Sequence, residues 1–335
     1  MCKKKNRIYY HDELRKHFFK LTTTFIMNKN ALDFWQKYEL IESTKTFIAI
    51  SNNPKSCRFC NLDEQHTTFN TEAHLIPELM GENKIISYDE CDKCNNKFSG
   101  FESHLSIFFR PYLTIMGVKG KKKIPTFQSR TEDGNEHTRT IITVNDNKRN
   151  VILQNLDDYQ ISKENKTFTI TFRKPPHKPF LVYKSLVKIA LSLLPSEKIK
   201  DYKNVFDWIL DKSNETDAFI TAFITVIKAG KFRKPFAELY SAKRIYYKNH
   251  FLPEMTCIIG FGNVVVQIFL PLSNTFDYKK AKLKTPTLNL FPSVIYDKNK
   301  TVFNFKAIDL IEKNSITYNE ILHFSFEDAE INIPR

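Results

Sequence analysis

The sequence predicts an α+β fold in two parts, a small cysteine-stapled unit followed by a larger domain with mainly antiparallel strands. Three observations support this prediction. Two Cys-x-x-Cys pairs, Cys57/Cys60 and Cys91/Cys94, enclose two short β-prone runs. A helical run follows the second pair directly. Beyond residue 126, β-prone runs separated by turn residues alternate with two apolar helical runs, a pattern typical of an α+β domain.

The first expected element is an amphipathic helix over residues 28–41. Apolar residues such as Leu32 and Trp35 recur on one side of this segment at helical spacing. A short β-prone run at residues 46–50 then leads into the first cysteine pair.

The segment between the cysteine pairs is expected to form two strands. Residues 72–77 and 84–88 have the composition of strands, and Gly81 begins the turn between them. The run after Cys94 is helical in character and is expected to end at Pro111, because proline interrupts helical hydrogen bonding. Strand, strand and helix, with cysteines at both ends, would form one compact unit.

The second half is expected to combine helices with antiparallel strands. The helices are expected over residues 180–194 and 201–210, and Lys184 and Lys188 share one face of the first, which we expect to face water. The strands are expected over residues 140–144, 151–153, 167–172, 219–227, 237–247, 255–259, 264–270 and 301–305.

Paired cysteines have different meanings in different compartments. The chain opens with three lysines and polar residues, without the apolar run of a signal peptide. No apolar run approaches the roughly 20 residues that span a bilayer. We therefore expect a cytoplasmic protein that does not enter a membrane. In that reducing compartment, four thiolates at this spacing indicate a closed tetrahedral zinc site rather than disulfides.

The net charge of +14 favours a polyanionic partner. A lysine-rich loop with Lys119, Lys121, Lys122 and Lys123 is expected to attract nucleic-acid phosphates without sequence preference, in a salt-dependent way. The alternative for this loop is a solvated connector. His177 lies in a second basic loop that could also touch phosphates.

The enclosed segment has residues suited to phosphodiester hydrolysis, which needs an activated water and neutralisation of phosphate charge. A histidine can be the general base, because its ordinary pKa lies near neutrality. A divalent cation held by oxygen ligands can polarise the phosphate and stabilise the departing oxygen. His74 on the first expected strand and Asn95 at the start of the expected helix are residues of these types.

The run EAHLIPELMG, which begins at Glu72, and the run CDKCNNKF, which begins at Cys91, resemble the HNH endonuclease (ββα-metal) motif. They are most similar to the branch with a four-cysteine zinc, and the resemblance covers roughly residues 55–125. It implies that His74 is the general base and that Asn95 binds or organises a catalytic cation, Mg²⁺ or another divalent ion. It also implies a structural Zn²⁺ whose ligands are Cys57, Cys60, Cys91 and Cys94.

One position departs from the family pattern. Many members have an acidic residue or a histidine directly before the base as a metal ligand, where this chain has Ala73. Strand alternation places Glu72 on the opposite face, so it cannot replace that ligand without a bulge. The third ligand is then expected from the helix, either Glu102, seven residues after Asn95, or His104, nine after it. We favour Glu102, while structural roles for both residues stay open.

These expectations describe an HNH endonuclease that cuts DNA, with RNA as an open alternative. The division expected is an N-terminal part, residues 1–125, with the nuclease core at about 55–112, and an α+β domain, residues 126–335. That domain would serve target binding, dimerisation or regulation. A homodimer would explain double-strand cleavage, and a role in defence against foreign DNA is expected by analogy alone. The rivals are a non-catalytic zinc-dependent nucleic-acid-binding protein and a nuclease gated by a ligand- or partner-sensing C-terminal domain.

Overall fold

A computed structural model describes residues 31–46, 56–129, 140–145, 148–153, 159–213, 216–227, 231–292 and 303–325. Its helices are α2 (Ala31–Lys37), α3 (Asp92–Ile115), α4 (Pro179–Ser192), α5 (Lys203–Ile209) and α6 (Tyr278–Ala281), with two short 3-10 helices, η1 (Glu78–Met80) and η4 (Ser196–Lys198). Its strands are β1 (Tyr38–Ser43), β2 (Phe127–Gln128), β3 (Ile141–Asn145), β4 (Lys148–Ile152), β5 (Tyr159–Ser162), β6 (Thr167–Arg173), β7 (Thr221–Ile227), β8 (Phe236–Ala242), β9 (His250–Phe251), β10 (Met255–Phe261), β11 (Val264–Phe269), β12 (Thr285–Pro286), β13 (Phe303–Asp309) and β14 (Asn319–Ser325).

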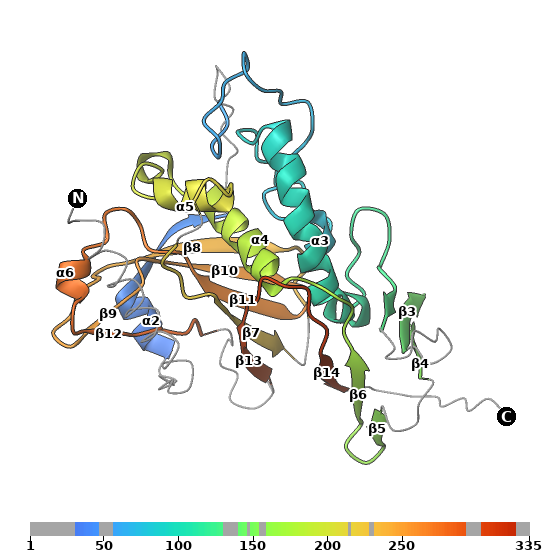
Figure 1. Ribbon diagram of the computed structural model, residues 1–335. Coiled ribbons are helices and arrows are strands. Elements are labelled where there is room, and N and C mark those ends of the chain that lie inside the picture. Colours follow the sequence, from blue (N-terminus) through green and yellow to red (C-terminus); the bar gives the residue numbers. More distant parts are fainter. Residues whose placement is uncertain are drawn as a thin grey trace.

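A six-stranded antiparallel sheet forms the centre of the fold (Figure 1). Its strand order is β1-β8-β10-β11-β7-β13, and each neighbouring pair is antiparallel. Two smaller antiparallel sheets, β14-β6-β5 and β2-β3-β4, lie beyond α3, and a short parallel pair joins β12 to β9. The predicted α+β class with mainly antiparallel strands is confirmed.

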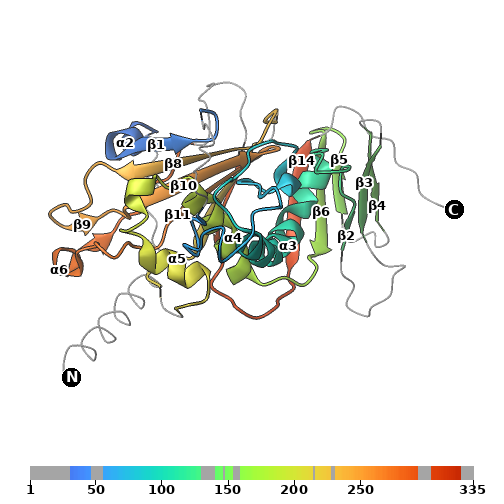
Figure 2. The same cartoon turned by 90° about the horizontal axis from the view of Figure 1, so that it is seen from above.

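The two faces of the central sheet are both apolar because successive side chains point to opposite sides of a strand. On β10, Cys257 and Ile259 join a core that includes α3 and α4, whereas Ile258 joins a second core with Phe34 of α2. Figure 2 shows α3, α4 and α5 on one side of the sheet and α2 on the other. Helix α2, which precedes the cysteine-paired segment, and helix α4, which follows it, therefore cover different faces of the central sheet.

The predicted helix over residues 28–41 is wrong in its second half. α2 ends at Lys37, and the chain continues as β1, which pairs with β8 across a register shift between Leu40 and Glu42. Backbone pairing to a sheet edge outweighs the helical spacing of the apolar residues, so Leu40 is half exposed instead of facing a core. The run at 46–50 lies largely outside the described residues.

The predicted end of the long helix at Pro111 is also wrong, since α3 continues to Ile115. Proline removes one backbone N–H, which leaves the carbonyl of Ile107 without its usual helical partner. The last turn persists because Tyr112, Leu113 and Ile115 are buried in the main core. Burial of an apolar face stabilises helices more than intrinsic propensity does.

The two predicted helices of the second half are confirmed as α4 and α5, but the expected water-facing side of α4 is wrong. Lys184 and Lys188 are both buried. Lys184 donates to the backbone carbonyl of Trp208 and forms an ion pair with Asp211. Sequence alone suggests solvent for these positions because charged residues are rarely buried without partners.

The second basic loop holds two of its basic residues in the interior, while Lys178 is exposed. His177 and Lys174 are both buried, and the Lys174 ammonium pairs with the Glu320 carboxylate of β14, Nζ to Oε2, at 2.5 Å. The hypothesis that this loop touches phosphates is therefore wrong for these two residues. β14, which provides Glu320, was not predicted from the sequence.

The central sheet and the main core each contain residues from both sides of residue 125 in the chain. β1 precedes that residue in the chain but forms the edge of the central sheet beside β8. The main core joins residues of the cysteine-rich segment, α3, α4 and the central sheet in one cluster. Within the described residues, no helix is both long and apolar enough to cross a bilayer.

Candidate active site and metal centre

The four cysteines of the two pairs meet in one cluster. Cys57 and Cys60 lie on a tight turn, Cys91 caps α3, and Cys94 lies in its first turn. The four sulfur atoms all lie within 4.8 Å of one another, and the Sγ atoms of Cys60 and Cys91 are 3.7 Å apart. Tetrahedral Zn²⁺ with Zn–S bonds of about 2.3 Å places its sulfurs about 3.8 Å apart. The cluster fits a closed zinc site.

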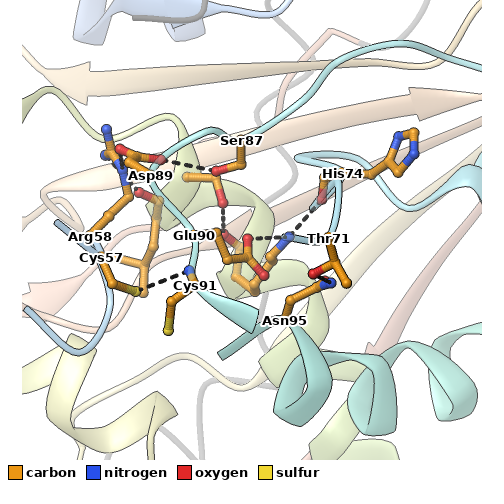
Figure 3. A network of polar contacts seen from close by, with 12 residues as sticks. Cys57, Arg58, Thr71, His74, Ser87, Asp89, Glu90, Cys91 and Asn95 are labelled. Carbon is orange, nitrogen blue, oxygen red and sulfur yellow. Dashed lines mark hydrogen bonds and ion pairs between the residues drawn. The ribbon is translucent and has the colours of Figure 1, made fainter. Parts of the chain in front are cut away.

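Local backbone geometry prepares this cluster for metal. Asn61 adopts φ 61°, and its N–H donates to the carbonyl of Cys57 at 2.8 Å, closing the turn. The N–H of Cys91 donates to Cys57 Sγ at 3.5 Å (Figure 3). A hydrogen bond from the side chain of Cys94 lowers the pKa of Cys57 to about 5. A thiolate, the form that binds zinc, is therefore favoured at Cys57, whereas burial raises the pKa of Cys60 to about 11.

Asp92, which the sequence analysis did not single out, fastens the preceding loop to the start of α3. Its carboxylate accepts hydrogen bonds from the Thr68 and Thr71 hydroxyls and from the N–H groups of Asn70 and Thr71. Hydrogen bonds from Thr68, Thr71 and Asn70 hold the pKa of Asp92 well below its usual range. An acidic residue in the first turn of a helix was a usable signal for this role.

His74 lies on an extended segment that meets its partner in a single antiparallel bridge, His74 to Ile86. Two backbone hydrogen bonds flank this bridge: Leu75 N–H to the Ile85 carbonyl, and Ser87 N–H to the Ala73 carbonyl. The predicted strands at 72–77 and 84–88 are thus paired, over fewer residues than expected.

The His74 imidazole is mostly buried, with 19% of its side chain exposed. Its Nε2 is 3.6 Å from the Glu78 Oε2 atom. Its Nδ1 is buried and has no hydrogen-bond partner among the described residues. Nε2 is therefore the nitrogen that is placed beside a carboxylate.

Asn83 holds the loop that carries Glu78 and was missed by the sequence analysis. Its amide Nδ2 donates to the carbonyls of Ile76 and Gly81, at 3.2 and 2.9 Å. Its Oδ1 accepts from the N–H of Ile85 at 3.1 Å. One buried amide thus satisfies three backbone groups on both sides of the hairpin, and an asparagine in a Gly-containing turn was the available signal.

Lys188 of α4 reaches the hairpin from the second half of the chain. Its ammonium donates to the backbone carbonyl of His74 at 2.7 Å and pairs with the Glu90 carboxylate at 3.0 Å. Both side chains are at most 1% exposed. Burial raises the pKa of Glu90 to about 7, against the opposing effect of Lys188. The backbone that carries His74 is therefore fixed by a buried ion pair.

Asn95 and His74 come from neighbouring segments, but their side chains diverge. The Asn95 amide Nδ2 donates to the Thr71 hydroxyl at 3.2 Å. In Figure 3 the imidazole ring of His74 points away from Asn95 and Thr71. No direct hydrogen bond joins the two residues in the described contacts.

The two candidates for a third ligand do not join Asn95 either. Glu102 lies two turns further along α3, about 10 Å along the axis. Burial raises the pKa of the partly buried Glu102 carboxyl, and the charge of Lys188 opposes that shift. His104 accepts the N–H of Lys178 at Nδ1, at 3.2 Å. Helix α3 packs against α4, and the residue just before α4 provides the partner of His104.

The residues described do not bring the expected ligands of a catalytic cation together. Ala73, at the position of the missing ligand, is buried. The four cysteines are the only group of three or more His, Cys, Asp or Glu side chains that converges within the described ranges. The structure therefore fits the structural zinc, and this arrangement of Asn95, Glu102 and His104 does not fit a second ion.

The lysine loop packs closely against the hairpin loop. Glu82 N–H donates to the Lys119 carbonyl at 3.0 Å, and a Cβ on Gly120 would lie 3.3 Å from the Glu78 carbonyl oxygen. Lys121 Nζ is 3.7 Å from Glu78 Oε2. The side chains of the loop point to solvent around this anchor: Lys119, Lys121, Lys122 and Lys123 are all exposed.

Comparison with known proteins gives one match. Residues 57–106 match the family model of the HNH endonuclease, over the four cysteines, His74 and Asn95. No curated protein and no solved structure matches the chain. The matched segment begins at the first cysteine of the zinc cluster and ends within α3. This part of the chain is therefore similar to the HNH endonuclease family.

Proposed function

We propose that the chain is an endonuclease that hydrolyses phosphodiester bonds in nucleic acid, with DNA as its substrate. The observation that carries the proposal is the HNH endonuclease match at residues 57–106, in which His74 lies beside the lysine loop. The net charge of +14 supports a polyanionic substrate.

In this proposal His74 Nε2 takes the proton from the attacking water. The buried Nδ1 leaves Nε2 as the nitrogen for this task. The Glu78 carboxylate, 3.6 Å from Nε2, stabilises the imidazolium that forms. Lys188 holds the backbone carbonyl of His74, so the base keeps its place relative to the zinc-stapled turn.

The two metals differ in this proposal. A Zn²⁺ at the four cysteines is structural, because four thiolates leave no open position for water or phosphate. HNH nucleases use a divalent cation in catalysis, and Asn95 is the residue that the family resemblance assigns to it. We assign no step to that ion, because the described ligands do not converge around Asn95.

Incubation of the full chain with plasmid DNA in Mg²⁺, in Mn²⁺ and in chelator tests the proposal. We expect cleavage that requires the divalent cation and that falls by at least about a hundredfold in His74→Ala, the usual contribution of a general base. His323→Ala, an exposed histidine on β14, is the matched control and should cleave as the wild type does. Cleavage that survives His74→Ala would rule out His74 as the base.

A second candidate function is a non-catalytic zinc-dependent nucleic-acid-binding protein. Two observations favour it: the buried Ala73 at a usual ligand position, and the absence of a converging second ligand set in the described part of the chain. This candidate requires DNA binding by both the wild type and His74→Ala, with cleavage by neither in any divalent cation.

Further proposals concern the assembly and context of the protein. A homodimer would place two active sites on opposite strands, and sizing in solution tests it. The second half of the chain could regulate the nuclease in response to a ligand or partner protein. A cytoplasmic location is proposed because paired cysteines that bind metal suit a reducing compartment, and a role in defence against foreign DNA is proposed by family analogy alone.

A further inference from the structure

A pocket of about 220 Å³ lies between the helix and the lysine loop of the nuclease segment. One wall is the face of α3 formed by Ser106, Arg110 and Leu113, at helical spacing. η1 adds Leu79, and the lysine loop closes the rest. The complete lining is Leu79, Ser106, Arg110, Leu113, Gly120, Lys121, Lys123 and Pro125.

The lining has three cations and no carboxylate. Arg110, Lys121 and Lys123 are cationic, whereas Leu79, Leu113 and Pro125 are apolar. The pocket therefore combines positive charge with apolar walls. That combination suits a ligand with an anionic group attached to a less polar body, and a nucleotide has this character.

Arg110 has a hydrogen-bond donor that lacks an acceptor among the described residues. Its NH2 nitrogen donates to the Ser106 hydroxyl at 2.9 Å. Its Nε is buried and has no hydrogen-bond partner among the described residues. A guanidinium presents its N–H groups in a planar fork that matches phosphate, and a buried donor without an acceptor costs free energy. A phosphate oxygen that reached Nε after a turn of the Arg110 side chain would remove that cost.

The pocket is connected to the proposed base through Lys121 and Glu78. Lys121 lines the pocket, and its Nζ is 3.7 Å from the Glu78 carboxylate, which in turn is 3.6 Å from His74 Nε2. The close approach of Gly120 to the Glu78 carbonyl fixes the loop in this place. Beyond the other end of the lysine loop, the Pro125 carbonyl accepts a hydrogen bond from the Thr114 hydroxyl at 2.9 Å.

We propose that this pocket binds the phosphate of a nucleotide next to the one that His74 attacks, with Arg110 as the main ligand. The phosphate contacts Arg110, Lys121 and Lys123, and the attached sugar or base lies against the apolar wall. This inference rests on the proposed function, since it places the pocket on the same nucleic-acid strand. It assigns a site to Arg110, which lies outside the matched segment and outside the expected lysine set.

Fluorescence anisotropy with the full chain and a short labelled single-stranded DNA tests this site, in buffer without added divalent cation so that no cleavage occurs. We expect Arg110→Gln to weaken binding at least about tenfold, as for loss of one charge-assisted hydrogen bond to phosphate. The slope of log affinity against log salt should also fall by about 0.7 for each lost phosphate contact. Lys163→Gln, an exposed lysine in the β5–β6 turn, removes the same charge elsewhere and should change affinity less than about twofold.

Competition by thymidine 5′-monophosphate and by inorganic phosphate separates a strand phosphate from a free nucleotide as the ligand. Unchanged DNA affinity in Arg110→Gln would overturn the proposal, and so would Arg110-dependent binding of the mononucleotide without binding of DNA. If Arg110→Gln does not fold, as judged by thermal unfolding and zinc content, Lys121→Gln carries the test, because that side chain is 75% exposed. If the protein does not cleave plasmid DNA but binds DNA through Arg110, the nuclease proposal is refuted and the proposed phosphate site is supported.

Discussion

Replacement of Lys188 by methionine removes the ammonium that holds the nuclease hairpin from the other half of the chain. That ammonium pairs with Glu90 at 3.0 Å and donates to the His74 carbonyl at 2.7 Å. Glu102 adds a second, partly buried carboxyl close enough to interact with the same ammonium. Methionine has a similar length and fills most of the space, so the change tests charge rather than volume.

The expected loss of stability is about 3–5 kcal/mol, the usual effect of removing one partner from a buried ion pair. We expect a value near the upper end of that range, because neither side chain is more than 1% exposed and solvent therefore screens the pair little. The carboxylate of Glu90 would stay in the interior without its cation. Neutralising Glu90 as well, in Lys188→Met with Glu90→Gln, should restore at least about 2 kcal/mol of that loss.

Urea unfolding of the zinc-loaded full chain at pH 8 measures these differences, since Glu90 is ionised above its pKa of about 7. Lys163→Met, on an exposed turn, is the control and should stay within about 0.5 kcal/mol of the wild type. A loss below about 1 kcal/mol in Lys188→Met would refute the ion-pair argument. A double variant no more stable than the single one would refute it as well.

Three further outcomes follow from the buried polar groups and the cysteine cluster. Burial raises the pKa of Glu90 from 4.5 to about 7, so the folded state binds this proton more tightly than the unfolded state. The resulting stabilisation is complete below about pH 4.5 and is lost as the pH rises through 7. The free energy of unfolding of Glu90→Gln, measured with urea, should therefore rise relative to the wild type by up to about 3 kcal/mol between pH 5 and pH 8. A difference that does not vary with pH would contradict this. Metal analysis should find one zinc per chain, reduced in Cys94→Ser and retained in the control Cys257→Ser, whose buried thiol lies outside the cluster. Asn83→Ala should lose about 2–3 kcal/mol in unfolding, because three backbone groups lose their partner, and a loss under 1 kcal/mol would argue against its role in the hairpin.

The parts that could be predicted from sequence are those set by local chemistry. Two Cys-x-x-Cys pairs specify a tetrahedral site whatever surrounds them, and the four sulfurs converge as expected. The long apolar run of α4 and the short, continuous apolar runs of β10 and β11 identify buried elements, because burial on every side determines their composition. These features need no knowledge of distant partners.

The parts that could not be predicted depend on residues far apart in the chain. Lys188 has the spacing of a solvent-facing residue, and Glu90 and the His74 carbonyl, about a hundred positions earlier, explain its burial. Glu102 and His104 have the right types and spacing for a cation, but α4 and the loop before it supply other partners. Helical spacing fixes the direction of a side chain, whereas the packed neighbour decides what that side chain meets.

The same contacts explain why the nuclease segment is built into the sheet domain rather than attached to it. Arg58, inside the first cysteine pair, pairs with Asp89 at 2.7 Å and donates to the carbonyls of Leu191 and Leu194, one at the C-terminal end of α4 and one just beyond it. Lys188, one turn earlier, holds His74 and Glu90. Both sides of the hairpin therefore depend on α4, which lies on the central sheet (Figure 1). Displacement of α4 would leave the Arg58 guanidinium, the Glu90 carboxylate and several backbone carbonyls without their hydrogen-bond or ion-pair partners. Any partner that shifts this helix would thus change the position of the proposed base, so the proposed regulation of the nuclease would act through α4.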